Sequence, residues 1–408
     1  SDPARPRRPG SAATPTPRRP VGPFFTRWGF GQTICPRGKS FAENPHRPWK
    51  EYLARLARPQ GVPPLQSPPL AEVPDIALVS LGTTPGLVRS DESFAGLVRA
   101  AGASCEVVPV RIGRLARALR RQIAVTDLVE ALSARGAVRG RAVVYSTITA
   151  ALFQRPEQPY AIRFDATASV NRHGPSGAWQ RAAEKRPLRG ARMLLPVSRG
   201  AEAGVPISGP PVVRLPIPVE EIPGAPVRDI DAVAYAGYPR KRGLETLCRA
   251  WAAAGPAGGR FVIGGLDREK GMRWLQRSGV PEPAGVEWAG DLPRAEWLRL
   301  VARAGVYLNA SRWEDFGLGP LEALSAGAVL ATVPTLGSFE ALPLARELAP
   351  ELVSDDLASA LRAALAMDEA ARPDYAERAR QLLTPYREER LIAVVRDTVL
   401  PALGIEPR

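Results

Sequence analysis

The chain contains few of the residues that build metal centres or disulfide frameworks. Its 408 residues include two histidines, His46 and His173, and three cysteines, Cys35, Cys105 and Cys248. Cysteines this scattered match neither a disulfide framework nor a spaced zinc site, and two distant histidines argue against a His-based metal centre. We therefore expect no bound metal and a reducing, cytoplasmic setting.

Long apolar runs are also missing. None reaches the roughly 18 residues needed to cross a bilayer, and the first residues hold no apolar segment of signal-peptide type. These absences favour a cytoplasmic location over an integral membrane protein. They leave peripheral contact with a membrane open.

Positive charge is in excess, and it is concentrated at one end. The formal net charge is +14, and residues 1–70 alone carry 12 Lys or Arg against 3 Asp or Glu. In the rest of the chain, basic and acidic residues are therefore nearly equal in number. This near-neutral charge weakens a nucleic-acid-binding interpretation of the folded body. We expect no specific nucleic-acid partner.

The same N-terminal segment is rich in proline. Residues 1–70 hold 15 of the 43 prolines, a composition that buries little apolar area, so we predict a disordered Pro/Arg-rich extension. Trp49, Leu53 and Leu56 recur at helical spacing and predict one short helix within it. An extension without a role and a tether for anionic lipid or nucleic acid are both open interpretations.

From about Asp75 onward, short apolar strands alternate with helical stretches. The first half has predicted strands at 76–81, 105–110, 143–146, 160–164 and 193–197, and a basic helical stretch at 115–123. After a Pro-rich linker at 216–226, the second half has predicted strands at 233–237, 261–265, 286–290, 305–309 and 328–333. This alternation is typical of parallel, doubly wound α/β sheets.

One stretch of the second half combines a loop, a helix start and two carboxylates. It has the sequence SRWEDFGLGPLEAL and lies at 311–324, between two predicted strands. The loop of such a βαβ unit lies at the carboxyl ends of the strands, where ligands bind. Pro320 suits the first helical turn and Gly319 its cap, so the free N–H groups there predict an anion site. Glu314 and Glu322 border this site, which would suit a diphosphate together with sugar hydroxyls.

Each carboxylate also has a purely structural interpretation. Glu322 can complement the helix dipole or close a capping box, and Glu314 with Asp315 fits a solvated loop. For either glutamate alone the structural interpretation is favoured. The two together, beside a Gly-rich loop, favour a ligand site.

The stretch resembles a known signature. Seven residues separate Glu314 from Glu322, with Phe316-Gly317-Leu318 between them and the run EALSAG starting at Glu322. This pattern resembles that of retaining glycosyltransferases with the GT-B fold, family four (glycosyl transferases group 1). The resemblance is specific over residues 229–345 and only architectural over 75–225.

The resemblance implies a nucleotide-diphosphate sugar as donor substrate, with no separate cofactor. It implies that Glu314 contacts the hydroxyls of the sugar and Glu322 the ribose, with the donor site lined by Phe316, Gly317 and Leu318. It also places the loop that ends at Glu340 over the donor, although Glu340 fits a helix cap equally well.

Three consecutive cations, Arg240, Lys241 and Arg242, occupy a strand-to-helix turn of the second half. Such cations can neutralise a diphosphate, Arg through forked hydrogen bonds and Lys as a point charge, and a solvated basic turn is the alternative. The resembled family carries an Arg directly after the preceding glycine, where this chain has Tyr238. We therefore predict that Lys241 or Arg242 contacts the phosphate and that Arg240 assists.

Two further donor-side positions follow from the resemblance. Gly265 ends the strand 261–265, and Trp288 lies in the strand 286–290, whose end is expected to pack on the nucleobase.

The acceptor side is less clearly marked. The loop containing Gly82 lacks the full spaced glycines of a dinucleotide site and, by resemblance, lines the cleft. Family members often carry a histidine after the strand 160–164, where this chain has Asp165 and, further along, His173. A polar loop residue without chemistry is an equal interpretation of both. Ser198 matches the serine at the strand end of the family.

The pair Asp229 and Asp231 invites a metal interpretation, because the other large glycosyltransferase fold uses Asp-x-Asp to hold a divalent ion. Here the pair precedes a strand instead of ending one. We interpret it as solvated linker charge, with no metal implied.

The predicted organisation is a disordered extension at 1–70, an acceptor domain at 71–225, a donor domain at 226–385 and a C-terminal helix at 386–408 that returns to the first domain. The predicted reaction is metal-independent transfer of a hexosyl group to an acceptor hydroxyl with retention. Saccharide, lipid-linked and small-molecule acceptors all stay open. A sugar-nucleotide epimerase and an inactive nucleotide-sugar-binding protein are the alternatives, since fold does not decide activity.

Overall fold

The computed structural model describes residues 73–111, 123–136 and 138–408. The described residues all belong to one compact unit, residues 71–408. The predicted disordered extension and its short helix at 49–56 lie outside the described residues. The same holds for most of the basic helical stretch predicted at 115–123.

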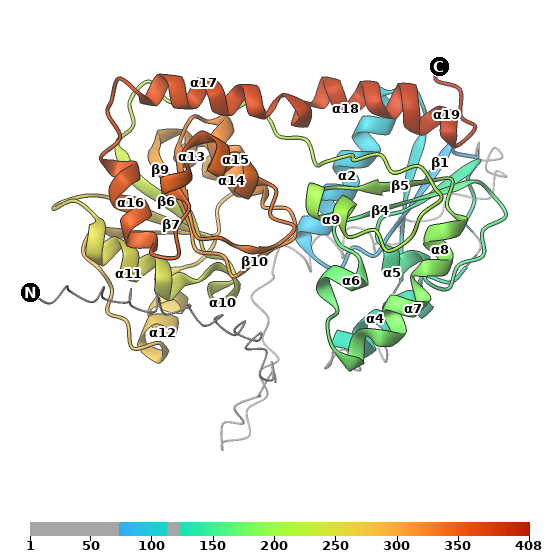
Figure 1. Cartoon of the computed structure of the whole chain (residues 1–408), viewed down its shortest axis with the longest axis horizontal. Helices are drawn as coiled ribbons and strands as arrows, with labels where there is room; N and C mark the ends of the chain where they lie inside the picture. The colour runs from blue at the N-terminus through green and yellow to red at the C-terminus, as the bar shows by residue number, and fades with distance from the viewer. Residues whose placement is uncertain (1–72, 112–122, 137) are drawn as a thin grey trace, which may run out of the picture. The chain divides into compact units, whose positions relative to one another are not determined.

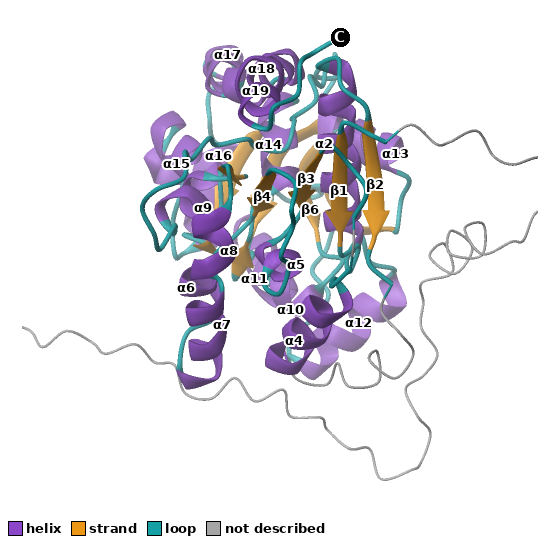
Figure 2. Cartoon of the chain, turned by 90° about the vertical axis from the view of Figure 1, so that its right-hand side faces the viewer, coloured by secondary structure: helices purple, strands orange, loops and turns teal. Residues whose placement is uncertain are grey.

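The first half of the described chain forms a five-stranded parallel sheet. Its strands, in the order β2-β1-β3-β4-β5, are β1 (Ile76–Ser80), β2 (Cys105–Pro109), β3 (Ala142–Tyr145), β4 (Tyr160–Phe164) and β5 (Met193–Pro196). Its helices are α2 (Pro85–Ala100), α4 (Ile123–Ser133), α5 (Ile148–Ala151), α6 (Ala168–Asn171), η1 (Pro175–Gly177), α7 (Ala178–Ala183), α8 (Lys185–Gly190) and α9 (Arg199–Ala203). Figure 2 shows β1 and β2 side by side, with their arrowheads pointing the same way.

The second half forms another five-stranded parallel sheet. Its strands, in the order β11-β9-β6-β7-β8, are β6 (Ile230–Tyr235), β7 (Phe261–Gly264), β8 (Val286–Gly290), β9 (Ala304–Asn309) and β11 (Val329–Thr332). A separate two-stranded ladder pairs β10 (Trp313–Glu314) with β12 (Leu336–Gly337). The helices are α10 (Pro239–Arg242), α11 (Leu244–Ala254), α12 (Arg268–Arg277), α13 (Arg294–Arg303), α14 (Leu318–Ser325), α15 (Ala341–Leu348), η2 (Pro350–Leu352), α16 (Leu357–Leu365) and α17 (Arg372–Leu382).

Both sheets change direction of winding at an internal strand. In the first, β1 lies between β2 and β3, and in the second, β6 lies between β7 and β9. The carboxyl ends of parallel strands at such a point form the usual ligand crevice of a doubly wound sheet. The prediction of two Rossmann-like α/β domains is confirmed.

The chain ends in η3 (Thr384–Tyr386), α18 (Glu388–Val394), the π-helical η4 (Val395–Val399) and α19 (Leu400–Ala402). Figure 1 shows α18 beside α2. Leu391, Val395, Val399 and Leu403 belong to the same buried cluster as Ile76 and Leu78 of β1. The last helical segment therefore completes the apolar core over one face of the first sheet, because those side chains would otherwise leave β1 and α2 uncovered.

No helix in the described parts of the chain combines the length and the apolar character that crossing a membrane requires.

Candidate functional site

The basic turn after β6 meets the central carboxylates at the carboxyl edge of the second sheet. Arg242 of α10 forms an ion pair with Glu314 of β10 and lies 3.3 Å from the Ser311 hydroxyl. Lys241 donates to Asp315 at 3.1 Å, and its Nζ lies 4.0 Å from Glu314. The structure thus brings Lys241 and Arg242 to Glu314, which lies far from them in the sequence.

Glu314 is buried and does not lie in a solvated loop. It belongs to β10, whose ladder with β12 sets the backbone, and its side chain is only 4% exposed. Ser311 donates to its Oε1 at 2.9 Å. The solvated-loop interpretation is therefore wrong for Glu314, because a buried carboxylate needs the partners that Arg242 and Ser311 supply.

The helix after the loop, α14, starts earlier than the sequence predicts. Gly317 is its N-cap with φ +84°, and Gly319 lies inside the first turn instead of capping it. A Cβ on Gly317 would meet the ring of Phe339 at 2.6 Å. The left-handed backbone and the close ring both require glycine here. The N–H groups of Gly317, Leu318 and Gly319 lack helical partners, and Pro320 has no N–H. They form the positive end that suits an anion.

Glu322 lies in α14 between two guanidinium groups. Arg294, the first residue of α13, lies 2.5 Å from its Oε1 and also contacts Glu220 at 2.7 Å. Arg89 of α2 lies 3.8 Å from the same oxygen. Burial raises the pKa of Glu322 to about 7, and the Arg294 guanidinium partly offsets this rise.

Arg294 and Arg89 were not among the predicted site residues. Arg294 follows the loop after β8, so its position at a strand-to-helix connection was a usable signal. Arg89 lies in the second turn of an amphipathic helix, and nothing in its sequence context distinguishes it from a solvated residue.

Asp165 follows β4, and its side chain is exposed. The pKa of its carboxyl nevertheless differs from the ordinary value. Withdrawal of water by the surrounding protein and repulsion from Asp315 raise its pKa to about 6. His173 lies beyond the short helix α6 and is exposed. Arg172, beside it, makes a forked ion pair with Asp127 of α4 at 2.7 and 3.2 Å, which holds the loop. Of the two, Asp165 is thus the one that lies near the central stretch, through Asp315.

Two other predicted acceptor-side positions have clear local roles. Gly82 has φ +56° directly after β1, and Ser198 is the N-cap of α9, accepting from the Ala201 N–H at 3.0 Å. Both shape the loop ends at the carboxyl edge of the first sheet.

Several aromatic residues lie near the two positions, Gly265 and Trp288, that are predicted to face the nucleobase. Gly265 has φ +77° at the end of β7, beside Tyr235, whose ring packs edge-on against Trp297 at 5.7 Å. Trp288 donates its indole N–H to Glu282 at 2.7 Å, and its ring packs on Gly271 of α12. Tyr235, which the sequence analysis did not single out, therefore lies beside the Gly265 turn.

Two other predicted donor-site residues lie in the central stretch. Phe316 is buried and packs edge-on against Tyr386 at 6.5 Å, and Leu318 is partly exposed. Arg240, in α10, is exposed.

Glu340 does not cap the helix that follows it. Its buried carboxylate accepts the backbone N–H of Arg199 at 2.9 Å and the Tyr386 hydroxyl at 2.7 Å. It therefore caps the start of α9, a helix of the first sheet.

The Asp229–Asp231 pair is not simple linker charge. Asp229 pairs with Arg303 and, at 2.9 Å, with Arg260, and Asp231 accepts the backbone N–H of Arg260 at 2.8 Å within β6. These contacts fasten the amino end of the second sheet. Within the described ranges, no group of three or more His, Cys, Asp or Glu side chains is placed to hold a metal.

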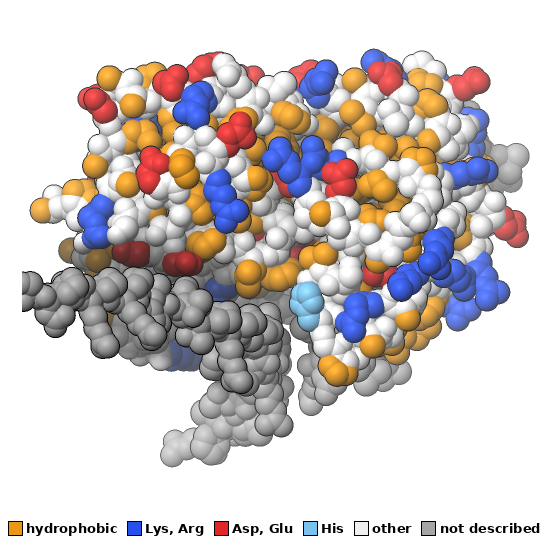
Figure 3. Space-filling model, viewed as in Figure 1, with side chains coloured by type: hydrophobic (Ala, Val, Ile, Leu, Met, Phe, Trp, Pro, Cys, Tyr) orange, Lys and Arg blue, Asp and Glu red, His pale blue; other side chains and the backbone are white. Residues whose placement is uncertain are grey.

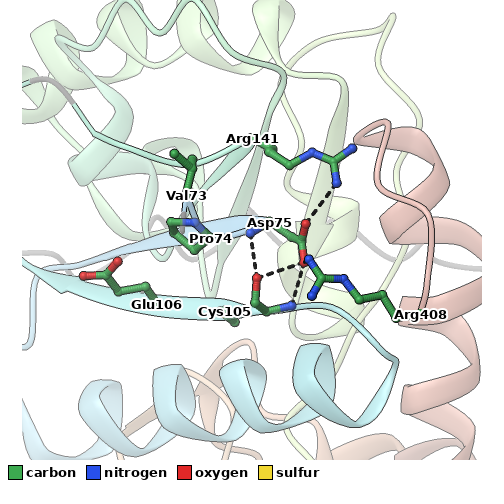
Figure 4. A pocket seen from close by; sticks show the side chains of 8 residues that line it. Val73, Pro74, Asp75, Cys105, Glu106, Arg141 and Arg408 are labelled. Carbon is green, nitrogen blue, oxygen red and sulfur yellow. Dashed lines mark hydrogen bonds and ion pairs between the residues drawn. The ribbon is translucent and has the colours of Figure 1, made fainter. Parts of the chain in front are cut away.

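The opposite edge of the first sheet holds a hollow with a structural role. Asp75 accepts from the Ser104 backbone N–H and hydroxyl, and it pairs with Arg141 at 3.0 Å. Figure 4 shows Asp75 with Arg141 and Arg408 on either side of it. Arg408 lies 3.6 Å from the same carboxylate. The charged and polar groups there are partners of one another. They lie at the amino ends of β1, β2 and β3, whereas ligands of such sheets bind at the carboxyl ends of the strands.

Basic side chains also gather away from the central stretch. Figure 3 shows them over α7 and α8, where the exposed residues are Lys185, Arg186 and Arg189.

Comparison with known proteins agrees with the geometry of the central stretch. Residues 240–387 match the family described as glycosyl transferase-like. Over this range the chain is similar to a glycosyl transferase-like domain. No curated protein matches the chain in sequence. The matched range includes α10, β10 and α14, so the predicted resemblance to glycosyl transferases is confirmed over these elements.

Solved structures share the fold. WaaG, a glycosyltransferase of lipopolysaccharide biosynthesis, is 17% identical with a TM-score of 0.54 over 78% of this chain and 99% of its own. Anabaena HepE, solved with UDP and glucose, is 14% identical with a TM-score of 0.53, covering 81% and 99%. An E. coli protein solved with UDP-2-fluoro glucose is 11% identical with a TM-score of 0.56, covering 82% and 100%.

These likenesses confirm the GT-B arrangement of two Rossmann-like domains. Other matched structures are longer, and the chain spans only 57% of the length of two of them. The comparisons do not favour an epimerase or an inactive sugar-nucleotide-binding protein.

Proposed function

We propose that this glycosyl transferase-like chain transfers a hexosyl group from a nucleotide-diphosphate sugar to an acceptor hydroxyl, with retention at the anomeric carbon and without a metal. The observation that carries the proposal is the convergence of Lys241, Arg242 and Glu314 beside the start of α14. Cations and free N–H groups on one side and a buried carboxylate on the other suit a sugar diphosphate.

The donor lies with its diphosphate against α10 and the start of α14 in this proposal. Glu314 accepts hydrogen bonds from the sugar and Glu322 from the ribose. Because Arg242 and Lys241 already contact carboxylates in the donor-free site, they are oriented before the donor arrives. Preorganised charge of this kind stabilises a developing anion better than water does.

The reaction breaks the bond between the anomeric carbon and the diphosphate oxygen, and the leaving diphosphate takes the electron pair. The acceptor oxygen forms the new bond on the same face, and its proton passes to an oxygen of the leaving phosphate. No covalent carboxylate intermediate is required. Asp165, after β4, orients the acceptor from the first sheet, and Gly82 leaves the adjoining loop open to it.

The base of the donor is uridine in this proposal. Two structural neighbours were solved with UDP or a UDP-sugar analogue, and the Gly265 turn beside Tyr235 offers an aromatic surface for a base. The acceptor is a saccharide, a lipid-linked sugar or a small molecule with a free hydroxyl.

Thermal unfolding in the presence of nucleoside diphosphates and nucleotide sugars tests the donor site. A ligand that binds only the folded chain raises the midpoint by mass action, and we expect a selective rise with UDP and UDP-sugars that is the same with and without magnesium. Glu322→Gln should weaken the shift. No shift with any member of the panel would contradict the proposed function, and a shift that requires magnesium would contradict its metal independence.

Product analysis tests the reaction. Incubation with a UDP-sugar and a mixture of acceptors should give a glycoside with the anomeric configuration of the donor, measured by proton NMR. Release of an epimerised sugar nucleotide without acceptor would contradict transfer.

A further inference from the structure

The cations of the second sheet's loops are already matched by carboxylates. Lys241 contacts Asp315 at 3.1 Å, Arg242 pairs with Glu314, and Arg294 contacts Glu322 at 2.5 Å. Arg240, the third cation of α10, is exposed and is also engaged in an interaction of its own. A diphosphate that enters this site therefore meets a nearly neutral set of pairs, and its charge calls for a further cation.

Arg89 is the cation best placed to supply that charge. It extends from α2 of the first sheet, its side chain is 42% exposed, and its Nη2 lies 3.8 Å from Glu322. This separation exceeds the usual length of a hydrogen bond, and Arg294 already occupies the same carboxylate oxygen at 2.5 Å. Among the described residues, Glu322 is the only ion-pair partner of Arg89. The Glu322 carboxylate is buried, but it keeps Arg294 as its closer partner, so Arg89 can leave it at low cost.

The surroundings of Arg89 leave room for a ligand. The start of α2 is held by Thr84, whose hydroxyl accepts from the Leu87 N–H at 3.2 Å. At Gly86, one turn before Arg89 on α2, no described atom lies within 4 Å of where a Cβ would be. A rigid helix start beside open space presents the Arg89 guanidinium in a defined direction.

We propose that Arg89 binds the diphosphate of the donor, moving from Glu322 onto a phosphate oxygen when the donor enters. This inference rests on the proposed function and adds a phosphate ligand from the first sheet. The resembled family carries an Arg after the glycine of the basic turn, where this chain has Tyr238, 58% exposed. Arg89 supplies the guanidinium that Tyr238 does not.

The test compares three probes that differ only in phosphate: uridine, UMP and UDP. Their dissociation constants are measured by calorimetry for the unsubstituted chain, Arg89→Gln and Arg89→Lys. Because a charge-assisted hydrogen bond to phosphate is lost, we expect Arg89→Gln to raise the Kd for UDP about 10- to 100-fold. The Kd for UMP should rise less, and the Kd for uridine should stay within about twofold. Arg89→Lys, which keeps the charge but loses the fork, should lie between the two.

Arg189→Gln is the matched control. It also removes one exposed positive charge from the first half of the chain, but Arg189 does not pair with Glu322. It should leave all three dissociation constants unchanged. The thermal midpoint of Arg89→Gln should match that of the unsubstituted chain, because Glu322 keeps its closer partner Arg294.

Two results would overturn this inference while leaving the proposed function intact. One is an unchanged Kd for UDP in Arg89→Gln. The other is an equal rise for uridine, UMP and UDP, which would mean that Arg89 acts only through Glu322. Failure of the unsubstituted chain to bind any nucleoside diphosphate would overturn the proposed function, and this inference with it.

Discussion

Arg242 and Glu314 form an ion pair that joins α10 to β10. In the sequence, α10 follows β6, the first strand of the second sheet, and β10 follows β9, its fourth strand. The side chain of Glu314 is 4% exposed and that of Arg242 is 22% exposed. Arg242 also lies over the Tyr235 ring, 5.6 Å from its centroid. The pair therefore fixes the separation between the predicted phosphate-binding turn and the predicted sugar-binding carboxylate.

Arg242→Ala should destabilise the fold strongly. It leaves the buried Glu314 carboxylate without its guanidinium, and breaking a buried pair from one side costs about 3–5 kcal/mol. Urea denaturation measures the loss. Lys241→Ala is the control, because Lys241 is 36% exposed and such a contact contributes about 1 kcal/mol or less.

The double variant Arg242→Ala with Glu314→Gln separates pairing from packing. If the cost of Arg242→Ala comes from the uncompensated carboxylate, neutralising Glu314 should recover much of it. Additive losses in the double variant would show that Arg242 stabilises through its ring contact instead.

Donor affinity should rise with pH through about 7 because of Glu322. Burial raises the pKa of Glu322 to about 7, so the carboxyl is mostly protonated at pH 6 and mostly ionised at pH 8. The ionised form accepts hydrogen bonds from the ribose hydroxyls, and the Kd for a UDP-sugar should therefore fall over this range. A UDP-sugar suits the measurement because its diphosphate has no terminal group that titrates there.

Two variants check the origin of this pH dependence. Glu322→Gln should bind with a Kd that is flat in pH. Arg294→Gln removes the cation that partly offsets the burial of Glu322, so the midpoint should move to higher pH. A midpoint that stays in place in Arg294→Gln would contradict the assignment to Glu322.

Asp75→Asn should destabilise the first sheet at neutral pH and much less in acid. The Ser104 backbone N–H, with smaller help from the Ser104 hydroxyl and Arg141, holds the pKa of Asp75 below its ordinary value of 3.8. A lowered folded-state pKa contributes stability that is present above 3.8 and is lost as the pH falls through the folded value. We expect a loss of about 1–3 kcal/mol at pH 7 that shrinks towards pH 3, measured by urea denaturation. An equal loss at both pH values would contradict a charge-based role.

Gly317→Ala should weaken both stability and donor binding. Its φ of +84° disfavours any side chain, and a Cβ would press on the Phe339 ring at 2.6 Å, so the start of α14 must shift at a cost of about 1–3 kcal/mol. Gly96→Ala is the control, since Gly96 lies inside α2 with no described atom within 4 Å of the added Cβ. It should stabilise the chain by up to about 1 kcal/mol. Unchanged UDP binding in Gly317→Ala would mean that the α14 start does not hold the phosphate.

Much of the fold was predictable from the sequence because short apolar runs alternate with helical patterns. The predicted strands at 160–164 and 286–290 coincide with β4 and β8. Helix ends were less accurate: α14 starts at Leu318 because Gly317 adopts a left-handed backbone, and a glycine run does not reveal which member does so. The spacing of Glu314 and Glu322 predicted that both carboxylates lie near one loop, since a single βαβ unit carries them.

The partners of those carboxylates were decided by tertiary structure alone. Arg242, Arg294 and Arg89 reach the two glutamates from three different helices, and none is near them in the sequence. The same holds for Glu340, which caps α9 of the other sheet. Local sequence sets the backbone period and the turn chemistry, because these depend on neighbouring residues. Burial and ion pairing depend on which distant elements pack together, so the protonation of Glu322 and the role of Arg89 emerge only from the folded chain.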